Sequence, residues 1–324
     1  MTLENQFSRR QRNLLTVLQL LDTNGALSAK QLSNMTNLSV VSINKLIDVL
    51  SQNNLIDLNF INTRGRRAKI YQINYKNINL GLIQISQVNS EIIIDYSLTD
   101  LSGETLQKAS LRKKMNSISE ILNFIKDQTQ LNKPYKLIVG VSGDEMNDIM
   151  QLSDVAILEG INLSKALKIS TDIDSIIVND INAATLGAAT QLNQNQNSAV
   201  GIYFPKDFGP GVGIVINNQL ITGADGLAGE IVYSSINQNS EVHEQITAHL
   251  QNIIAFLNPN LLIVYIDELN FNSFQITQII QALHRNLPLH QNYKLDFNRN
   301  FQQDYSLGLA TIGKNDYFKI ISSN

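Results

Sequence analysis

The chain has 324 residues, of which 43% are hydrophobic, so it is long enough to bury more than one core and to form two or three domains. It contains no cysteine, which excludes disulfides and thiolate metal sites. No apolar run approaches membrane-spanning length and no apolar segment follows the first charges, so the sequence predicts a soluble, cytoplasmic protein without a membrane partner.

The net charge of −3 conceals an uneven distribution of charge. Residues 1–76 contain ten Lys or Arg and four Asp or Glu, whereas residues 77–324 contain fifteen and twenty-four. A basic first quarter followed by an acidic remainder predicts a unit that binds a polyanion, attached to a body that does not.

The basic unit has the pattern of three short helices followed by two strands. Apolar residues at helical spacing predict helices over residues 8–24, 29–36 and 40–54, and Ser28 and Ser39 are candidate caps for the last two. Strands are predicted over residues 55–61 and 69–75, joined by a basic turn. The side chains expected inside are Leu14, Leu15, Leu18, Leu21, Leu32, Met35, Ile43, Leu46, Ile47 and Leu50. This order predicts a winged helix-turn-helix domain over residues 1–76.

In such a domain the third helix enters the major groove of double-stranded DNA. It would expose Ser42, Asn44 and Lys45, which can reach bases or phosphates. Arg64, Arg66 and Arg67 at the turn could enter the minor groove. The alternative interpretation is a small interaction domain whose charges are merely solvated.

The segment after residue 77 alternates predicted strands and helices. Strands are expected over residues 78–86, 91–106 and 135–143, with a helix over residues 118–131. A further buried strand ends at Asn179-Asp180, before a helix of small residues. Asp180 is either an acid at the end of a strand that faces a cleft, or a cap for the helix that follows; the local pattern does not separate these two interpretations.

Residues 209–231 form a glycine-rich stretch that contains six of the 17 glycines. Two apolar runs flank Asn217-Asn218, which predicts a β-hairpin. Its glycines allow close approach of backbone or of a ligand. Glu230 is a lone carboxylate among small residues, and it either faces a ligand or caps the next turn.

Three motifs resemble the ROK family (repressors, open reading frames, kinases). They are Ala228-Gly229-Glu230, Asn179-Asp180 before Asn182-Ala183-Ala184, and Gly65-Arg66 at the wing. The resemblance implies an α/β fold in which the winged helix-turn-helix precedes a two-lobed, actin/hexokinase-like (ribonuclease H-like) ROK domain. The implied lobes are residues 77–193, joined by the C-terminal helix at 304–324, and residues 194–303.

The resemblance also implies sugar contacts. In the family's kinases the residue matched by Asp180 is the general base; here we expect it to contact a sugar, together with Asn162, Asn179, Glu230 and Tyr233. Tyr233 stands where the family has histidine. The cysteine-rich zinc site of the family has no counterpart, so no metal and no cofactor are expected.

The positions matched to the family's nucleotide site depart from its pattern. Ile83 stands at the position of an Asp, Asp207-Phe208 replace Gly-Thr, and Asp267-Glu268 replace paired glycines. The sequence therefore predicts a sugar-responsive transcriptional repressor, not an enzyme, that binds an operator as a homodimer or tetramer and a sugar or sugar phosphate between its lobes. The alternatives are an active sugar kinase and a regulator that has lost sugar sensing.

Overall fold

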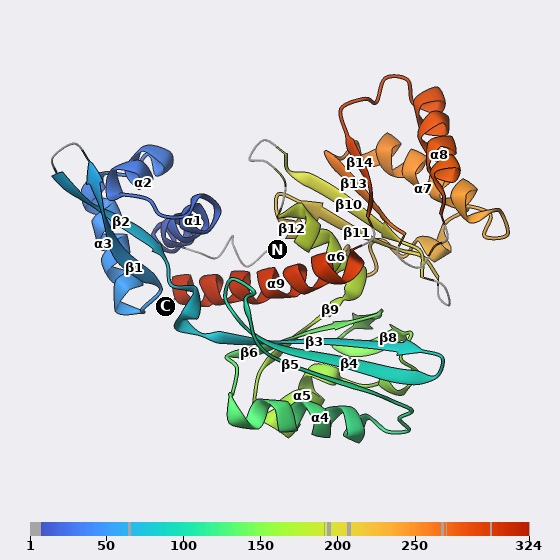
Figure 1. The fold of residues 1–324 in the computed structure, drawn as a ribbon, viewed down its shortest axis with the longest axis horizontal. Coiled ribbons are helices and arrows are strands. Elements are labelled where there is room, and N and C mark those ends of the chain that lie inside the picture. The colour runs from blue at the N-terminus through green and yellow to red at the C-terminus, as the bar shows by residue number, and fades with distance from the viewer. Residues whose placement is uncertain are drawn as a thin grey trace.

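The computed structural model describes residues 8–63, 66–190, 192, 196–205, 209–266, 269, 271–298 and 300–323. The predictions made for Arg64, Asp207-Phe208 and Asp267-Glu268 lie outside these residues, as does that for the side chain of Arg66. An N-terminal unit, which we call the head, and two α/β lobes lie around one long helix, α9 (Figure 1). Within the described residues, no helix is both long and apolar enough to cross a bilayer.

The head consists of three helices and one antiparallel hairpin. Its elements are α1 (Arg9–Asn24), α2 (Ala29–Thr36), α3 (Val40–Gln52), β1 (Ile56–Thr63) and β2 (Arg66–Ile73). Ser28 and Ser39 accept hydrogen bonds from the first-turn amides of Gln31 and Ser42, which confirms both predicted caps. The predicted core side chains are buried with one exception, Met35, which is 43% exposed because only Leu32 of α2 reaches the core.

The first lobe is a five-stranded sheet in the order β5-β4-β3-β6-β9. Its strands are β3 (Asn79–Val88), β4 (Glu91–Asp100), β5 (Thr105–Lys113), β6 (Lys136–Val141) and β9 (Ser175–Asn179). β3 to β5 form an antiparallel meander, and β6 and β9 run parallel to β3. Helices α4 (Ile118–Leu131) and α5 (Leu163–Thr171) cover the outer face (Figure 1). A small hairpin of β7 (Gly143–Met146) and β8 (Ile149–Ser153) follows β6.

The second lobe repeats this topology in the order β12-β11-β10-β13-β14. Its strands are β10 (Ser198–Tyr203), β11 (Gly211–Ile216), β12 (Gln219–Leu220), β13 (Leu261–Tyr265) and β14 (Lys294–Asn298), and its helices are α7 (Val242–Leu257) and α8 (Ser273–Asn286). The predicted hairpin in the glycine-rich stretch is confirmed as β11–β12. Asn217 and Asn218 both have positive φ, of 54° and 59°, as a tight two-residue hairpin turn requires.

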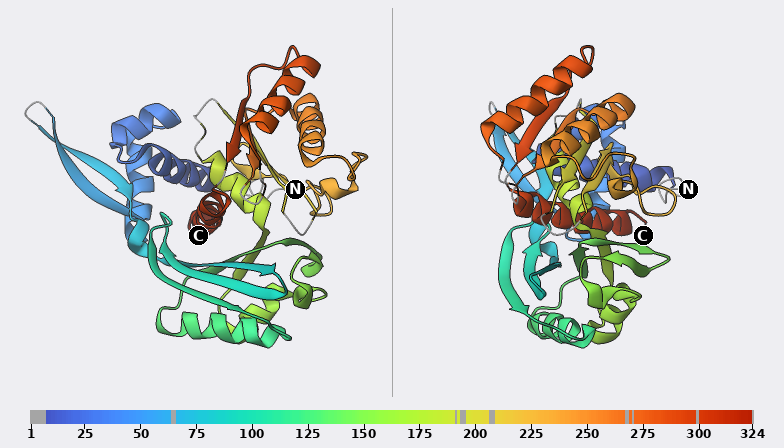
Figure 2. Two further views of the ribbon diagram at one scale, coloured as in Figure 1. Left: turned by 45° about the vertical axis from the view of Figure 1, so that its right-hand side comes forward. Right: turned by 90° about the vertical axis from the view of Figure 1, so that its right-hand side faces the viewer.

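Two helices, α6 (Asp180–Ala189) and α9 (Phe301–Ser323), lie between the lobes (Figures 1 and 2). They cross at glycines: a Cβ on Gly308 would lie 1.8 Å from the carbonyl oxygen of Ala183, and one on Gly187 would lie 1.9 Å from that of Asp304. Residues 180–189, which were predicted to belong to the first lobe, contact both sheets and α9. On the side of the second sheet the packing is tight, because a Cβ on Gly213 would lie 2.3 Å from Oγ1 of Thr185.

The C-terminal half of α9 joins the body to the head. Leu18 of α1, Phe318 of α9 and Leu80 of β3 belong to one continuous buried cluster. Polar contacts add to this interface, because Lys314 of α9 forms an ion pair with Asp22 of α1 at 2.8 Å. α9 therefore extends from the interface of the lobes to α1 of the head.

Candidate ligand site between the lobes

Four carboxyl groups gather where the two lobes meet, and we call them with Ser142 the carboxylate cluster. Asp144 lies on β7, Asp154 follows β8, Asp180 opens α6, and Glu230 lies in the second lobe before the short helix η4 (Ile231–Tyr233). The carboxyl groups of Asp144 and Glu230 influence each other: the neighbouring Glu230 lowers the pKa of Asp144, and the neighbouring Asp144 raises the pKa of Glu230. Ser142 donates a hydrogen bond to Asp154, and its hydroxyl is close enough to Asp180 to lower the pKa of that carboxyl group.

The strand order explains why these groups meet. β6 and β9 are parallel neighbours, so the residues that follow them, Ser142 and Asp180, emerge at the same edge of the sheet. Asn179 ties the two strand ends together: its Nδ2 donates to the carbonyl of Gly143 at 3.3 Å, and its Oδ1 caps α6 through the amide of Asn182 at 3.3 Å. Asn179, not Asp180, is therefore the cap, and the Asp180 carboxylate remains in the first turn of α6.

Burial raises the pKa of every carboxyl group in the cluster. Desolvation is the largest cause for Asp180, whose pKa rises to about 7; the charges of Asp154 and Glu230 add to the rise, and the hydrogen bond from the Ile181 amide and the nearby hydroxyl of Ser142 oppose it. Desolvation and the neighbouring Asp144 raise the pKa of Glu230 to about 7. The pKa values of Asp144 and Asp154 are also raised, chiefly by desolvation.

The cluster has the chemistry of a site for hydroxyl groups. Within the described residues, no Lys, Arg or His contributes to the four pKa shifts. Carboxyl oxygens accept hydrogen bonds, so a ligand with several O–H donors would match them. Among the described residues, no three acidic, histidine or cysteine side chains are placed to hold a metal ion.

Two of the predicted sugar contacts have other surroundings. Oδ1 of Asn162 caps α5, because it accepts hydrogen bonds from the amide of Lys165 at 2.8 Å and from the hydroxyl of Ser164 at 3.1 Å. Tyr233 is 73% exposed at the end of η4. Asn179, Asp180 and Glu230 belong to the site or border it.

Three members of the cluster were not singled out from the sequence: Ser142, Asp144 and Asp154. One feature of the sequence could have predicted them: a serine and several acidic residues follow directly after a buried strand, over residues 142–154. The β7–β8 hairpin, which positions Asp144 and Asp154, was not predicted, because its strands are short and carry no regular apolar alternation.

On the side of the family's nucleotide site, Ile83 is fully buried and belongs to the core that also contains Ile121 and Ile125 of α4. The next residue of β3, Gln84, reaches α9 instead, where its Nε2 donates to Oγ of Ser306 at 3.1 Å. The face of β3 toward α9 thus carries a neutral amide at this position. Gly229 has φ of 104°, and a Cβ there would lie 1.8 Å from the carbonyl oxygen of Val212, so close backbone packing accounts for this glycine.

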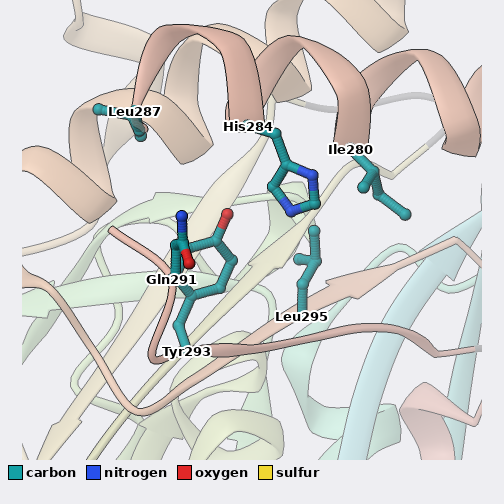
Figure 3. A pocket seen from close by; sticks show the side chains of 6 residues that line it. All are labelled: Ile280, His284, Leu287, Gln291, Tyr293 and Leu295. Carbon is teal, nitrogen blue, oxygen red and sulfur yellow. The ribbon is translucent and has the colours of Figure 1, made fainter. Parts of the chain in front are cut away.

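The second lobe contains a separate cavity of about 570 Å³ (Figure 3). It is lined by Ile280, His284, Leu287, Gln291, Tyr293 and Leu295. None of these residues belongs to the carboxylate cluster, and the cavity lies between α8 and the segment that enters β14.

On the head, α3 exposes the three residues predicted to contact DNA. Ser42, Asn44 and Lys45 are exposed, while Ile43, Leu46 and Ile47 are buried on the opposite face. Ser42 also bonds the hydroxyl of the cap residue Ser39 at 2.9 Å. On β2, the guanidinium carbon of Arg67 lies 5.8 Å from the ring centre of Phe60 on β1.

The duplicated sheets, with two helices between them and a polar cluster at the strand ends, define an α/β protein of the sugar-kinase-like class. Residues 92–245 match the ROK family, and the chain carries a ROK family domain. The family predicted from the sequence motifs is thereby confirmed.

Relatives with similar sequences are named as repressors. The xylose repressor of Staphylococcus xylosus is 25% identical over 324 residues, covering 91% of this chain and 82% of that protein. The xylose repressor of Bacillus subtilis is 24% identical over 255 residues, covering 74% of this chain and 64% of that protein.

Solved structures show the same fold. A ROK family transcriptional regulator, described as a homologue of the Escherichia coli MLC protein, has a TM-score of 0.75 at 18% identity and covers 96% of this chain and 98% of its own. The ROK hexokinase of Thermus thermophilus has a TM-score of 0.59 at 12% identity, covering 71% of this chain and 97% of its own. The hexokinase likeness leaves out more than a quarter of the chain, whereas the regulator spans nearly all of it.

Proposed function

We propose that this protein is a sugar-responsive transcriptional repressor. The observation that carries the proposal is the course of α9. Its first turns lie beside the carboxylate cluster, where Tyr305 packs over Gly140 of β6, and its last turns lie against α1 of the head. A single helix therefore contacts both the candidate ligand site and the candidate DNA-binding unit.

The head acts as a winged helix-turn-helix on a double-stranded DNA operator. α3 is its recognition helix, with Asn44 placed to pair with adenine and Ser42 and Lys45 placed to reach bases or phosphates. The β1–β2 hairpin is the wing, and Arg64, Arg66 and Arg67 supply its positive charge. A homodimer would present two heads to a palindromic operator.

The carboxylate cluster receives the sugar. Asp180, Glu230 and Ser142 supply its polar groups, and Asn179 positions Asp180. Tyr233 and Asn162 remain predicted contacts. Since the relatives named above are xylose repressors, xylose is the first sugar to test.

The ligand alters operator affinity by favouring one arrangement of the lobes. It can shift that equilibrium only as far as its affinities for the two arrangements differ. Because α9 contacts α6 through Gly308 and the head through Lys314, a change in the angle between the lobes changes the position of the head.

A sugar kinase is the second candidate, and one observation favours it. Asp180 has a pKa of about 7, which suits a general base. The burial of Ile83 and the bonding of Gln84 to Ser306 argue against a nucleotide at β3. Incubation with ATP, Mg²⁺ and a panel of sugars separates the two functions: turnover would identify a kinase, and we expect none.

The proposal is tested by operator binding. Fluorescence anisotropy with DNA from upstream of the protein's own gene should show salt-dependent binding, and xylose or another sugar should change the Kd at least tenfold. Operator binding that no sugar alters would support the regulator without sugar sensing. Absence of any DNA binding would contradict the repressor assignment.

A further inference from the structure

The cavity in the second lobe is separate from the carboxylate cluster (Figure 3). It lies at the end of the sheet where β14 begins, next to Tyr293 and Leu295. The opposite end of the same strand approaches α9, because Nδ2 of Asn298 donates to Oδ2 of Asp304 at 2.8 Å. A ligand in this cavity would therefore leave the site between the lobes free.

The size and the aliphatic walls of the cavity suit a small molecule. Its volume of about 570 Å³ falls within the range of roughly 300 to 1,000 Å³ that is typical of small-molecule sites. Ile280 and Leu287 line it from the side of α8, and Leu295 lines it from the side of β14. A ligand that covers these three side chains removes their apolar surface from water, which favours binding.

Three polar side chains face the same space. Figure 3 shows His284 extending from α8 toward the segment that carries Gln291 and Tyr293. No hydrogen bond joins the imidazole of His284 or the hydroxyl of Tyr293 to another described residue. Nε2 of Gln291 donates to the carbonyl of Pro288 at 2.9 Å, which fixes this amide and leaves its oxygen as an acceptor. The cavity therefore offers a small set of polar groups that can orient a ligand.

The charge of the lining favours an uncharged ligand. Among the described residues that line the cavity there is no Asp, Glu, Lys or Arg. Burial raises the pKa of Tyr293, so its phenol stays protonated at neutral pH and acts as a hydrogen-bond donor. A carboxylate or phosphate would give up hydration here without meeting a lysine or arginine in return.

The rings of His284 and Tyr293 favour a flat ligand. Both are planar surfaces against which an aromatic ring can pack, and the aliphatic side chains cover the rest of such a ring. A sugar carries a hydroxyl on nearly every carbon, and three polar side chains would leave several of these hydroxyls without partners. The lining thus differs in chemistry from the carboxylate cluster.

We propose that this cavity is a second ligand site, which takes an uncharged aromatic compound that carries a hydroxyl or amide group. Ile280, Leu287 and Leu295 cover the apolar part of the compound, and Tyr293 and Gln291 orient its polar group. The site is independent of the sugar between the lobes and of the proposed repressor function.

The first experiment locates binding in the full chain. 4-Hydroxybenzamide is titrated into protein labelled in its isoleucine methyl groups and followed by NMR. The signal of Ile280 should shift, whereas that of Ile83, in the core of the first lobe, should not. No shift of Ile280 at millimolar concentrations of the compound would overturn the proposal.

Three matched compounds test the ligand class in the same titration. 4-Hydroxybenzoate adds a negative charge, 4-hydroxycyclohexanecarboxamide replaces the aromatic ring by a saturated one, and xylose replaces it by a sugar. Each should bind at this site at least about tenfold more weakly than 4-hydroxybenzamide. Equal or tighter binding by any of the three would refute the proposed class.

Variants test whether the cavity itself holds the compound, with calorimetry as the measure of affinity. Ile280→Trp places an indole ring in the cavity and should remove binding, while Gln281→Trp, an exposed change at the next position of α8, should leave the affinity unchanged. Tyr293→Phe keeps the ring but removes the donor, so binding should weaken about three- to tenfold. Thermal unfolding checks that each variant is folded.

Two outcomes of the variant experiment would contradict the second site. Unchanged affinity in Ile280→Trp or in Tyr293→Phe would mean that the compound binds elsewhere. Loss of a dimer in Ile280→Trp but not in Gln281→Trp, measured by light scattering, would identify the cavity as a contact between two copies of this chain.

Discussion

Asp22 of α1 and Lys314 of α9 form an ion pair of 2.8 Å that links the head to the body across 292 residues of sequence. Their side chains are only 22% and 17% exposed. The carboxylate of Asp22 also accepts a hydrogen bond from the hydroxyl of Tyr75 at 2.9 Å. Since the pair is largely desolvated, removing one partner leaves the other charge without its counter-ion and only partly hydrated.

The first prediction concerns this junction. Lys314→Met should keep most of the aliphatic packing but leave Asp22 without its cation. We expect a loss of about 1 to 3 kcal/mol in the free energy of unfolding. Operator binding should persist, and the effect of sugar on it should shrink, because the head loses its ion pair with α9 and only the buried cluster still joins them. Urea unfolding and anisotropy with and without sugar measure the two effects.

Lys133→Met serves as the control for Lys314→Met. It removes a pair of similar length, with Asp172 at 2.9 Å, whose side chains are 56% and 83% exposed. Exposed pairs contribute little to stability, because water screens the two charges. Equal losses in both variants would show that the junction pair has no special role.

The second prediction concerns Asp180. Asp180→Asn should abolish the sugar response, since an amide cannot accept hydrogen bonds at both of its terminal atoms. Operator affinity without sugar should stay within about twofold of the native value, because no head residue is changed. Titration calorimetry with sugar and anisotropy with operator check the two statements. An unchanged response to sugar would show that Asp180 does not contact the ligand.

The third prediction is a dependence of stability on pH. The pKa of Asp180 is raised from 3.8 to about 7 in the folded protein. Its contribution to stability is therefore complete below pH 4 and is lost as the pH rises toward 7. Asp180→Asn removes this loss, because the amide does not ionise. The free energy of unfolding of the variant should exceed that of the native protein by about 1 to 3 kcal/mol at pH 8, and by little at pH 4. The difference at pH 8 is smaller than the full pKa shift implies, because the side chain is partly solvated. Paired urea titrations at the two pH values test the sign.

The fourth prediction separates base recognition from charge on α3. Asn44→Ala should weaken the free energy of binding to the native operator by about 1 to 3 kcal/mol, and it should reduce discrimination between bases at one base pair. Lys45→Ala should weaken binding to all sequences alike and reduce the salt slope by about 1. The same salt titration on Lys126→Ala, an exposed change on α4, should reproduce the native slope. A slope that Lys126→Ala lowers as much as Lys45→Ala would mean that the body binds DNA.

The fifth prediction concerns the crossing of α6 and α9. Gly308→Ala places a methyl group 1.8 Å from the carbonyl oxygen of Ala183, so the helices must separate. We expect the free energy of unfolding to fall by about 1 to 3 kcal/mol and the Tm to fall by several degrees. Gly209→Ala, whose Cβ would meet the side chain of Val232 at 3.3 Å, is the milder comparison in a calorimetric scan. A Tm for Gly308→Ala as high as that of Gly209→Ala would mean that the crossing adapts easily.

Local patterns in the sequence predicted most of the fold. The apolar stripe of residues 118–131 gives α4 with the predicted bounds, and Asn217-Asn218 predicted the β11–β12 turn, because both signals depend on residues that are close in the chain. The carboxylate cluster depends on strand order, which brings Ser142 and Asp180 together across 38 positions, and periodicity carries no such information. Glu230 and Asp144 meet only through the contact between lobes, so local spacing could not pair them.

The glycines at the crossing of α6 and α9 give the long helix a mechanical property. From Gly308 to Ser323 the helix extends for about 22 Å, so a tilt of about 5° at the crossing displaces the far end by about 2 Å. Under the proposed function, α9 would pivot about this backbone contact, so that a small change in angle at the crossing would displace the head relative to the lobes.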